Sequence, residues 1–89
     1  MHAVVVKVRI DDGANAEKQL QETVVPRVKS APGFVAGYWT RSDDGDSGLS
    51  MLVFESEEAA KAVAEVIGAQ VPYGVTFVNA EVRRVVASA

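Results

Sequence analysis

Three of the aromatic residues, Phe34, Tyr38 and Trp39, fall within six positions, although aromatic residues make up only 7% of the 89 residues. They follow a Pro-Gly break and precede an acidic turn. The rings of Tyr and Trp combine a flat apolar surface with one polar atom, so they can hold an aromatic ligand and orient it. The same bulk also suits a contact between two copies of the chain or an ordinary core.

Five residues have side chains suited to a pocket for an aromatic ligand: Trp39, Tyr38, Tyr73, Asn79 and Arg41. Tyr38 and Trp39 are consecutive, so on a strand they point to opposite faces and at most one of them faces a pocket. No catalytic residue is assigned. A Ser-His-Asp triad is not indicated, because the single histidine, His2, stands beside the N-terminus.

Neither a metal ion nor a cofactor is expected. The sequence has no cysteine, and His2 is predicted to be an exposed terminal residue with no acidic pattern around it. The spacing of Asp43, Asp44 and Asp46 differs from the alternating ligands of a calcium loop, so these residues predict a solvated hairpin tip. No glycine pattern suited to phosphate precedes a helix, which argues against a nucleotide cofactor.

The composition narrows the partners further. The net charge is −3 and the basic residues are scattered, so no basic stripe predicts contact with nucleic acid. The apolar run at 3–10 is interrupted by Lys7 and Arg9 and is too short for a membrane span or a signal peptide. A cytoplasmic location is the simplest expectation, and the absence of cysteine is compatible with it.

Hydrophobic periodicity predicts four strands, at 3–10, 34–41, 49–55 and 75–86. A helix is expected between the first two strands, with Pro26 causing a kink or a fresh turn near Val25. A second helix is expected to begin after Ser56 as its N-cap and to end near Gly68. The order is βαββαβ, an α+β, ferredoxin-like fold in which two helices cover one face of a four-stranded antiparallel sheet. One domain is expected to span residues 1–89, with the first and third strands central and the fourth beside the first.

The face of the sheet without helices predicts a homodimer. The helix side is expected to carry Val4, Val6, Val8, Val78, Ala80 and Val82. The opposite face then carries both apolar and charged side chains. Five of its residues are candidates for the dimer contact: Lys7, Arg9, Phe77, Glu81 and Arg83. Pressing a second sheet against this face would bury the apolar members, while Lys7 or Arg9 pairs with Glu81 across neighbouring strands.

The segment "PGFVAGYWTR", within the longer stretch "VPRVKSAPGFVAGYW" at 25–39, together with the βαββαβ order resembles the antibiotic biosynthesis monooxygenase (ABM)-like domains of the dimeric α/β barrel superfamily. The resemblance spans nearly the whole chain. It implies a homodimer whose two sheets pack into a barrel, with a pocket between each sheet and its helices. Some relatives are cofactor-free monooxygenases that oxidise phenolic polyketides, and others degrade haem with iron held by a helix-borne histidine. A single histidine at position 2 disfavours haem chemistry here.

Three hypotheses follow. The first is a small dimeric α/β-barrel protein that binds a small molecule or acts as an accessory module, using the pocket between helices and sheet. The second is a cofactor-independent monooxygenase for an aromatic or polyketide-like compound, with Trp39, Tyr73 or Asn79 lining the pocket. The resemblance implies that Asn, Trp, Tyr and Arg side chains carry out this chemistry in the family. The third is a structural interaction module whose sheet binds a different partner.

Overall fold

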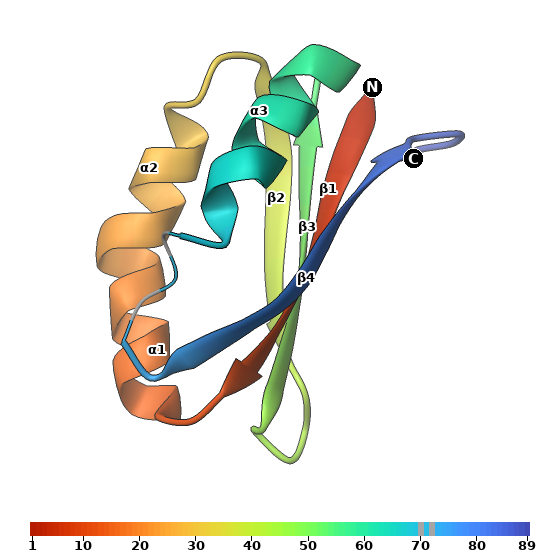
Figure 1. The fold of residues 1–89 in the computed structure, drawn as a ribbon. Coiled ribbons are helices and arrows are strands. Elements are labelled where there is room, and N and C mark those ends of the chain that lie inside the picture. The colour runs from red at the N-terminus through yellow and green to blue at the C-terminus, as the bar shows by residue number, and fades with distance from the viewer. Residues whose placement is uncertain (70, 72) are drawn as a thin grey trace.

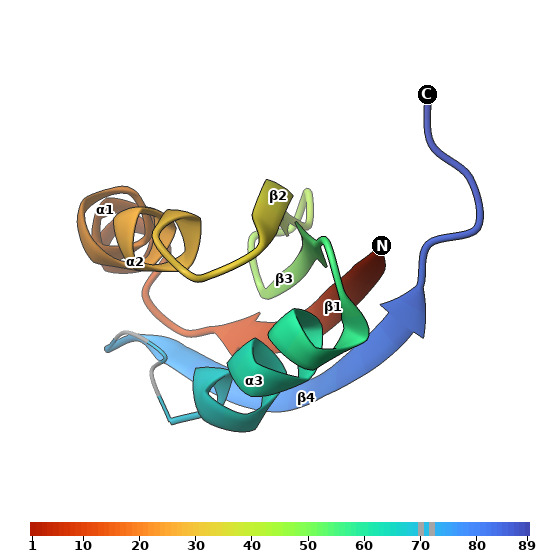
Figure 2. The same cartoon turned by 90° about the horizontal axis from the view of Figure 1, so that it is seen from above.

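Four antiparallel strands form one sheet in the order β2-β3-β1-β4, and the helices lie on one side of it (Figures 1 and 2). The computed structural model describes residues 1–69, 71 and 73–89. The elements are β1 (His2–Ile10), α1 (Gly13–Gln19), η1 (Leu20–Val24), α2 (Val25–Lys29), β2 (Phe34–Arg41), β3 (Ser47–Phe54), α3 (Glu57–Ile67) and β4 (Val75–Arg84). The predicted βαββαβ order and the central positions of the first and third strands are confirmed.

The first helical segment changes its winding before Pro26, as predicted. Segment η1 is a π-helix, and the Val25 N–H donates to the Leu20 carbonyl five residues earlier. Pro26 has no N–H to continue the α-helical ladder, and its ring clashes with the preceding turn of a regular helix. The wider π turn accommodates the proline, after which α2 continues to Lys29.

The second helix begins and ends where its capping residues predict. The Ser56 hydroxyl accepts a hydrogen bond from the Ala59 N–H at 3.1 Å, and Glu57 and Glu58 occupy the first turn. Negative charge there complements the positive end of the helix dipole. Ala60, which the periodicity did not single out, is fully buried, because its small side chain lets α3 lie close to the sheet.

The core lies between the helices and one face of the sheet. Its buried members are Val4, Val6, Val28, Leu52, Phe54 and Ala60. Phe34 on edge strand β2 packs edge-to-face against Phe54, with ring centroids 5.8 Å apart. A register shift at Val35 allows Phe34 and Trp39 to face the same side although five positions separate them, and both pack against this core.

A second register shift corrects the predicted faces of β4. Val6 pairs with Ala80 and Val8 with Phe77, so Val78 is an extra residue on β4. The ring of Phe77 consequently packs against the core and lies beside Gly68 at the end of α3, while Val78 is half exposed. The prediction of Phe77 on the dimer face and Val78 under the helices is wrong, because strict alternation along a strand ends at a bulge.

The expected position of His2 is also wrong. Its side chain is only 20% exposed, and its Nε2 lies 3.4 Å from Glu57 Oε2 at the start of α3. His2 begins β1 on the same face as Val4 and pairs with the buried Phe54, so the strand carries it under the helix.

The bulge predicts losses of stability of different size for two neighbouring substitutions. Phe77→Ala should lower the free energy of unfolding by about 2 kcal/mol, since it removes a ring packed beneath α3. Val78→Ala should cost less than about 1 kcal/mol, because that side chain is half exposed. Urea unfolding of both variants measures the difference, and a larger loss for Val78→Ala would mean that β4 alternates without interruption.

Candidate functional site

An apolar cleft opens between the sheet, the first helical segment and the end of α3. Its volume is about 100 Å³. The lining residues are Val6, Val8, Ile10, Ala16, Leu20, Val24, Trp39, Thr40, Gly48, Ser50, Ile67, Val71 and Val75. The π turn contributes both Leu20 and Val24 to this lining, so the irregular winding before Pro26 helps to shape the cleft.

Ser50 supplies a polar group on the floor of the cleft. It pairs with Val6 on β1 and with Trp39 on β2, in the middle of an otherwise apolar row. Its hydroxyl makes no hydrogen bond within the described part of the chain, whereas the Thr40 hydroxyl donates to the Leu49 carbonyl. A ligand in the cleft can therefore donate to, or accept from, Ser50. Sequence reasoning missed Ser50, although alternation with the apolar Leu52 and Phe54 places it on their face.

The five candidates for a pocket are dispersed by the fold. Trp39 lines the cleft. Tyr38 lies on the opposite face of β2 and is 70% exposed, as alternation requires. Tyr73 is 85% exposed in the turn before β4, where its carbonyl accepts a hydrogen bond from Asn15. Asn79 pairs with Lys7 and is exposed on the face away from the helices.

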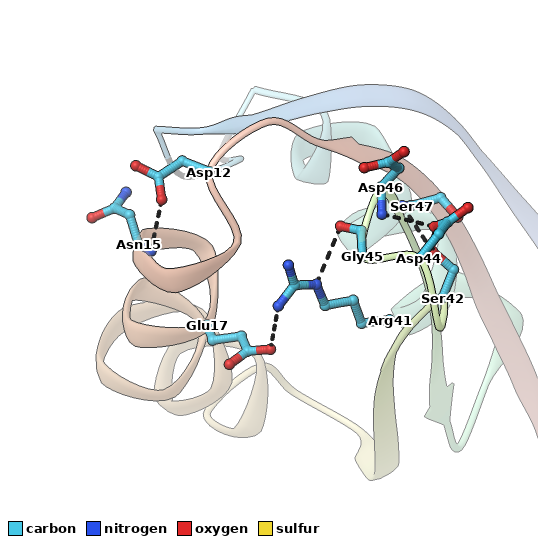
Figure 3. A network of polar contacts seen from close by, with 9 residues as sticks. All are labelled: Asp12, Asn15, Glu17, Arg41, Ser42, Asp44, Gly45, Asp46 and Ser47. Atoms are coloured by element: carbon cyan, nitrogen blue, oxygen red, sulfur yellow. Dashed lines mark hydrogen bonds and ion pairs between the residues drawn. The ribbon is translucent and has the colours of Figure 1, made fainter.

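Arg41, the fifth candidate, bridges the hairpin and the first helix (Figure 3). Its Nη1 donates to Glu17 Oε1 at 2.9 Å, and its Nε donates to the Gly45 carbonyl at 3.2 Å. Arg41 itself does not line the cleft, but it pairs in register with Gly48, which does. The ion pair therefore stands beside the part of the cleft nearest the β2–β3 turn.

Hydrogen bonds within the hairpin tip fix the carbonyl that holds Arg41 (Figure 3). Asp44 Oδ1 accepts from the Ser42 hydroxyl at 2.6 Å and from the Asp46 N–H at 2.9 Å. These two bonds, the one from Ser42 first, lower the pKa of Asp44 from its ordinary value. Gly45 has a φ of +82°, which a residue with a side chain rarely adopts. The acidic tip is exposed, as predicted, but it is also ordered by its own side chains.

The face of the sheet turned away from the helices, here called the open face, carries an exposed apolar patch. Tyr38 pairs with Met51 across β2 and β3, Met51 pairs with Val5 of β1, and Leu49 lies two residues before Met51. Tyr38, Leu49 and Met51 are exposed. Together with Val5, these three residues form the open-face patch.

Charged residues border the patch in pairs that differ from those expected. Glu81 meets Arg83 on its own strand at 2.8 Å, and Arg9 lies 3.4 Å from Asp11. The predicted pairing of Glu81 with a basic residue of β1 is absent from the described residues, because Glu81 pairs in register with Val5. Lys7 stands exposed between Leu49 and Asn79.

No three His, Cys, Asp or Glu side chains of residues 1–69, 71 and 73–89 cluster in a way that could hold a metal ion. Among those residues, no helix has the length and apolar character needed to cross a membrane.

Comparison with solved structures places this arrangement among known folds. A dimeric ferredoxin-like protein from an uncultured marine organism matches with a TM-score of 0.63 and 13% identity over 100% of this chain and 98% of that one. A monooxygenase from Streptomyces coelicolor, solved with nanaomycin D, matches with a TM-score of 0.57 and 18% identity over 99% and 92%. The haem degrader MhuD from Mycobacterium tuberculosis, solved with two haems, matches with a TM-score of 0.52 and 24% identity over 97% and 98%. This chain has an ABM-like fold.

The ABM-like fold is shown by structure rather than by sequence. No protein-family model matches the chain, and no curated protein matches it either. At 13–24% identity, the likeness to these structures concerns the course of the backbone and does not carry over their ligands or reactions.

The hairpin network predicts how one carboxyl group titrates. Ser42→Ala should raise the pKa of Asp44 toward 3.8, because it removes the largest cause of the lowered value. In the unmodified chain this network stabilises the hairpin tip at pH values above the ordinary pKa of the Asp44 carboxyl group. That stabilisation is lost as the pH falls through the lowered pKa.

Carboxyl-carbon NMR shifts of Asp44 followed against pH provide the measurement. Ser56→Ala, at the N-cap of α3, is the matched control and should leave the titration of Asp44 unchanged. An unchanged titration in Ser42→Ala would contradict the assignment of the hydrogen bond.

Proposed function

We propose that this protein is a homodimeric small-molecule-binding module whose cleft takes a small, mainly apolar ligand containing a ring. The observation that carries the proposal is the cleft itself, which is apolar apart from Thr40 and Ser50 and has Trp39 in its wall. Ligand sites of this kind combine an apolar lining with a few polar groups that orient the ligand. Ser50 and the indole of Trp39 are suited to that task.

The size of the cleft restricts the ligand. Its volume of about 100 Å³ approaches that of an apolar cavity of roughly 150 Å³ that holds benzene. Sites for drug-sized molecules are larger, at roughly 300–1,000 Å³. One ring with a short substituent therefore fits better than a fused polycyclic compound.

The chemistry of the lining favours binding over catalysis. None of the cleft residues that the structure describes is Asp, Glu, His, Lys, Arg, Cys or Tyr. General acid–base catalysis requires a titratable group within hydrogen-bond reach of the reacting atom. Only a reaction in which the ligand supplies its own acidic group would suit this lining.

A cofactor-independent monooxygenase for an aromatic substrate is the second candidate. It is supported by Trp39 in the cleft and by the backbone likeness to the Streptomyces coelicolor monooxygenase. Oxygen consumption with single-ring phenols as substrates tests it. Uptake that is lost in a variant with a blocked cleft would favour this candidate over the binding module.

The open-face patch supports the homodimer. Tyr38, Leu49 and Met51 lie side by side on the open face, and large exposed apolar patches mark interaction surfaces. The paired charges of Arg9 with Asp11 and Glu81 with Arg83 lie beside this patch, as polar residues do at the rim of an interface. An ABM-like domain is also small, and burying one sheet against another extends its limited core.

Ligand binding should change the fluorescence of Trp39, the only tryptophan in the sequence. Titration with benzyl alcohol, a neutral single-ring probe, should shift and saturate the emission. Ser50→Leu should abolish the effect, because the larger side chain fills the floor of the cleft and removes its hydroxyl. Ser30→Leu, at the exposed end of α2, is the matched control and should respond as the unmodified chain does. An emission that does not change on titration would overturn the binding proposal.

Sedimentation equilibrium should give the mass of two chains for the unmodified protein. Met51→Lys should weaken the association roughly 100-fold, since it places an unpaired charge in the apolar part of the contact. Val66→Lys on α3 is the control, because Val66 and Met51 are both 47% exposed and only Met51 lies on the open face. A single-chain mass for the unmodified protein at high concentration would instead favour the interaction module with a different partner.

A further inference from the structure

Arg41 has a hydrogen-bonding group that the protein does not use. Its Nη1 bonds Glu17 and its Nε bonds the Gly45 carbonyl, but its Nη2 has no hydrogen-bond partner within the part of the chain that the structure describes. A guanidinium group has five donors in a planar fork, an arrangement that matches a carboxylate. The structure therefore holds a positioned cation with spare donors beside Gly48, one of the residues that line the apolar cleft.

Two glycines make room for this guanidinium. A Cβ atom added to Gly13 would stand 1.9 Å from Nη2, and one added to Gly45 would stand 2.9 Å from it. Any side chain at position 13 would thus displace the group from its place between α1 and the hairpin. Figure 3 shows Arg41 reaching across this space, with Glu17 on one side and Gly45 on the other.

We infer that the ligand of the cleft carries one anionic group beside its apolar ring, and that Arg41 receives this group in competition with Glu17. The inference rests on the proposed binding function and specifies its ligand as a small aromatic carboxylate or a ligand of similar chemistry. The ring occupies the space beside Trp39 and Ser50. The anion reaches the guanidinium past Gly48, which lines the cleft and pairs in register with Arg41.

The surrounding charges limit how strongly an anion is preferred. Asp12 and Asp44 lie on either side of Arg41 (Figure 3), but each already accepts a backbone N–H, from Asn15 and Asp46 respectively. Glu17 is the carboxylate bonded to the guanidinium, and it is well exposed, so it can swing into water when a ligand anion takes its place. Partial exposure and the nearby carboxylates reduce the preference for an anion over a neutral isostere to about tenfold.

The test compares phenylacetate with phenylacetamide, which has nearly the same shape and no charge. Both are titrated against the 89-residue chain at pH 7, and binding is followed through Trp39 emission. Three variants are compared with the unmodified chain: Arg41→Gln, Glu17→Gln and, as a matched loss of one arginine on the neighbouring helix α2, Arg27→Gln. Gly13→Ala is a fourth variant, which keeps the charge of Arg41 but displaces its guanidinium.

The unmodified chain and Arg27→Gln should bind phenylacetate about tenfold more tightly than phenylacetamide. Arg41→Gln and Gly13→Ala should bind the two probes equally, with the affinity for phenylacetamide unchanged. Glu17→Gln should bind phenylacetate roughly threefold more tightly, because the internal competitor has lost its charge. A rise in affinity cannot result from a damaged fold, so this variant separates recognition of the anion from a structural effect.

Two results would overturn the inference. Equal binding of both probes by the unmodified chain would show that Arg41 does not select the ligand and would leave the binding function standing. Absence of any response to either probe, together with no response to benzyl alcohol, would remove the binding function and the inference together.

Discussion

Side chains alternate between the two faces of an extended strand, and this constraint governs every functional feature of the protein. One face of the sheet must bury Val4, Leu52 and Phe54 beneath the helices. The consecutive residues Tyr38 and Trp39 then go to opposite faces, with Trp39 in the cleft and Tyr38 exposed. The cleft and the open-face patch are thus two consequences of the same sheet.

Two bulges adjust this alternation where the fold requires it. The extra residue Val35 brings Phe34 and Trp39 to the same face, and the extra residue Val78 turns Phe77 toward α3. Without them the core would lose two rings to the open face. The π turn before Pro26 acts in a similar way, because it directs Leu20 and Val24 into the cleft. The two bulges and the π turn therefore decide which side chains reach the core and the cleft, while the order of the strands stays regular.

The topology could be predicted from the sequence because long apolar alternation and strong turn signals mark each element, as at β1 and at the Ser56 cap. The face of Phe77 could not, since the extra residue Val78 stands directly beside Phe77 and no glycine or proline signals the bulge. The ion pair of Arg41 with Glu17 joins residues 24 positions apart and depends on how the hairpin lies against α1. Of the predicted pocket residues only Trp39 lines the cleft, while Arg41 pairs in register with the lining residue Gly48.

We propose that the two faces of the sheet have separate tasks, one holding the ligand and the other the second copy. An isotope-filtered NOE measurement on a mixture of labelled and unlabelled chains, with phenylacetate present, tests it most directly. Contacts between chains are expected at the Met51 and Leu49 methyl groups, and contacts with the ligand at those of Leu20 and Val24. Ligand contacts at Met51, or contacts between chains at Leu20, would contradict it.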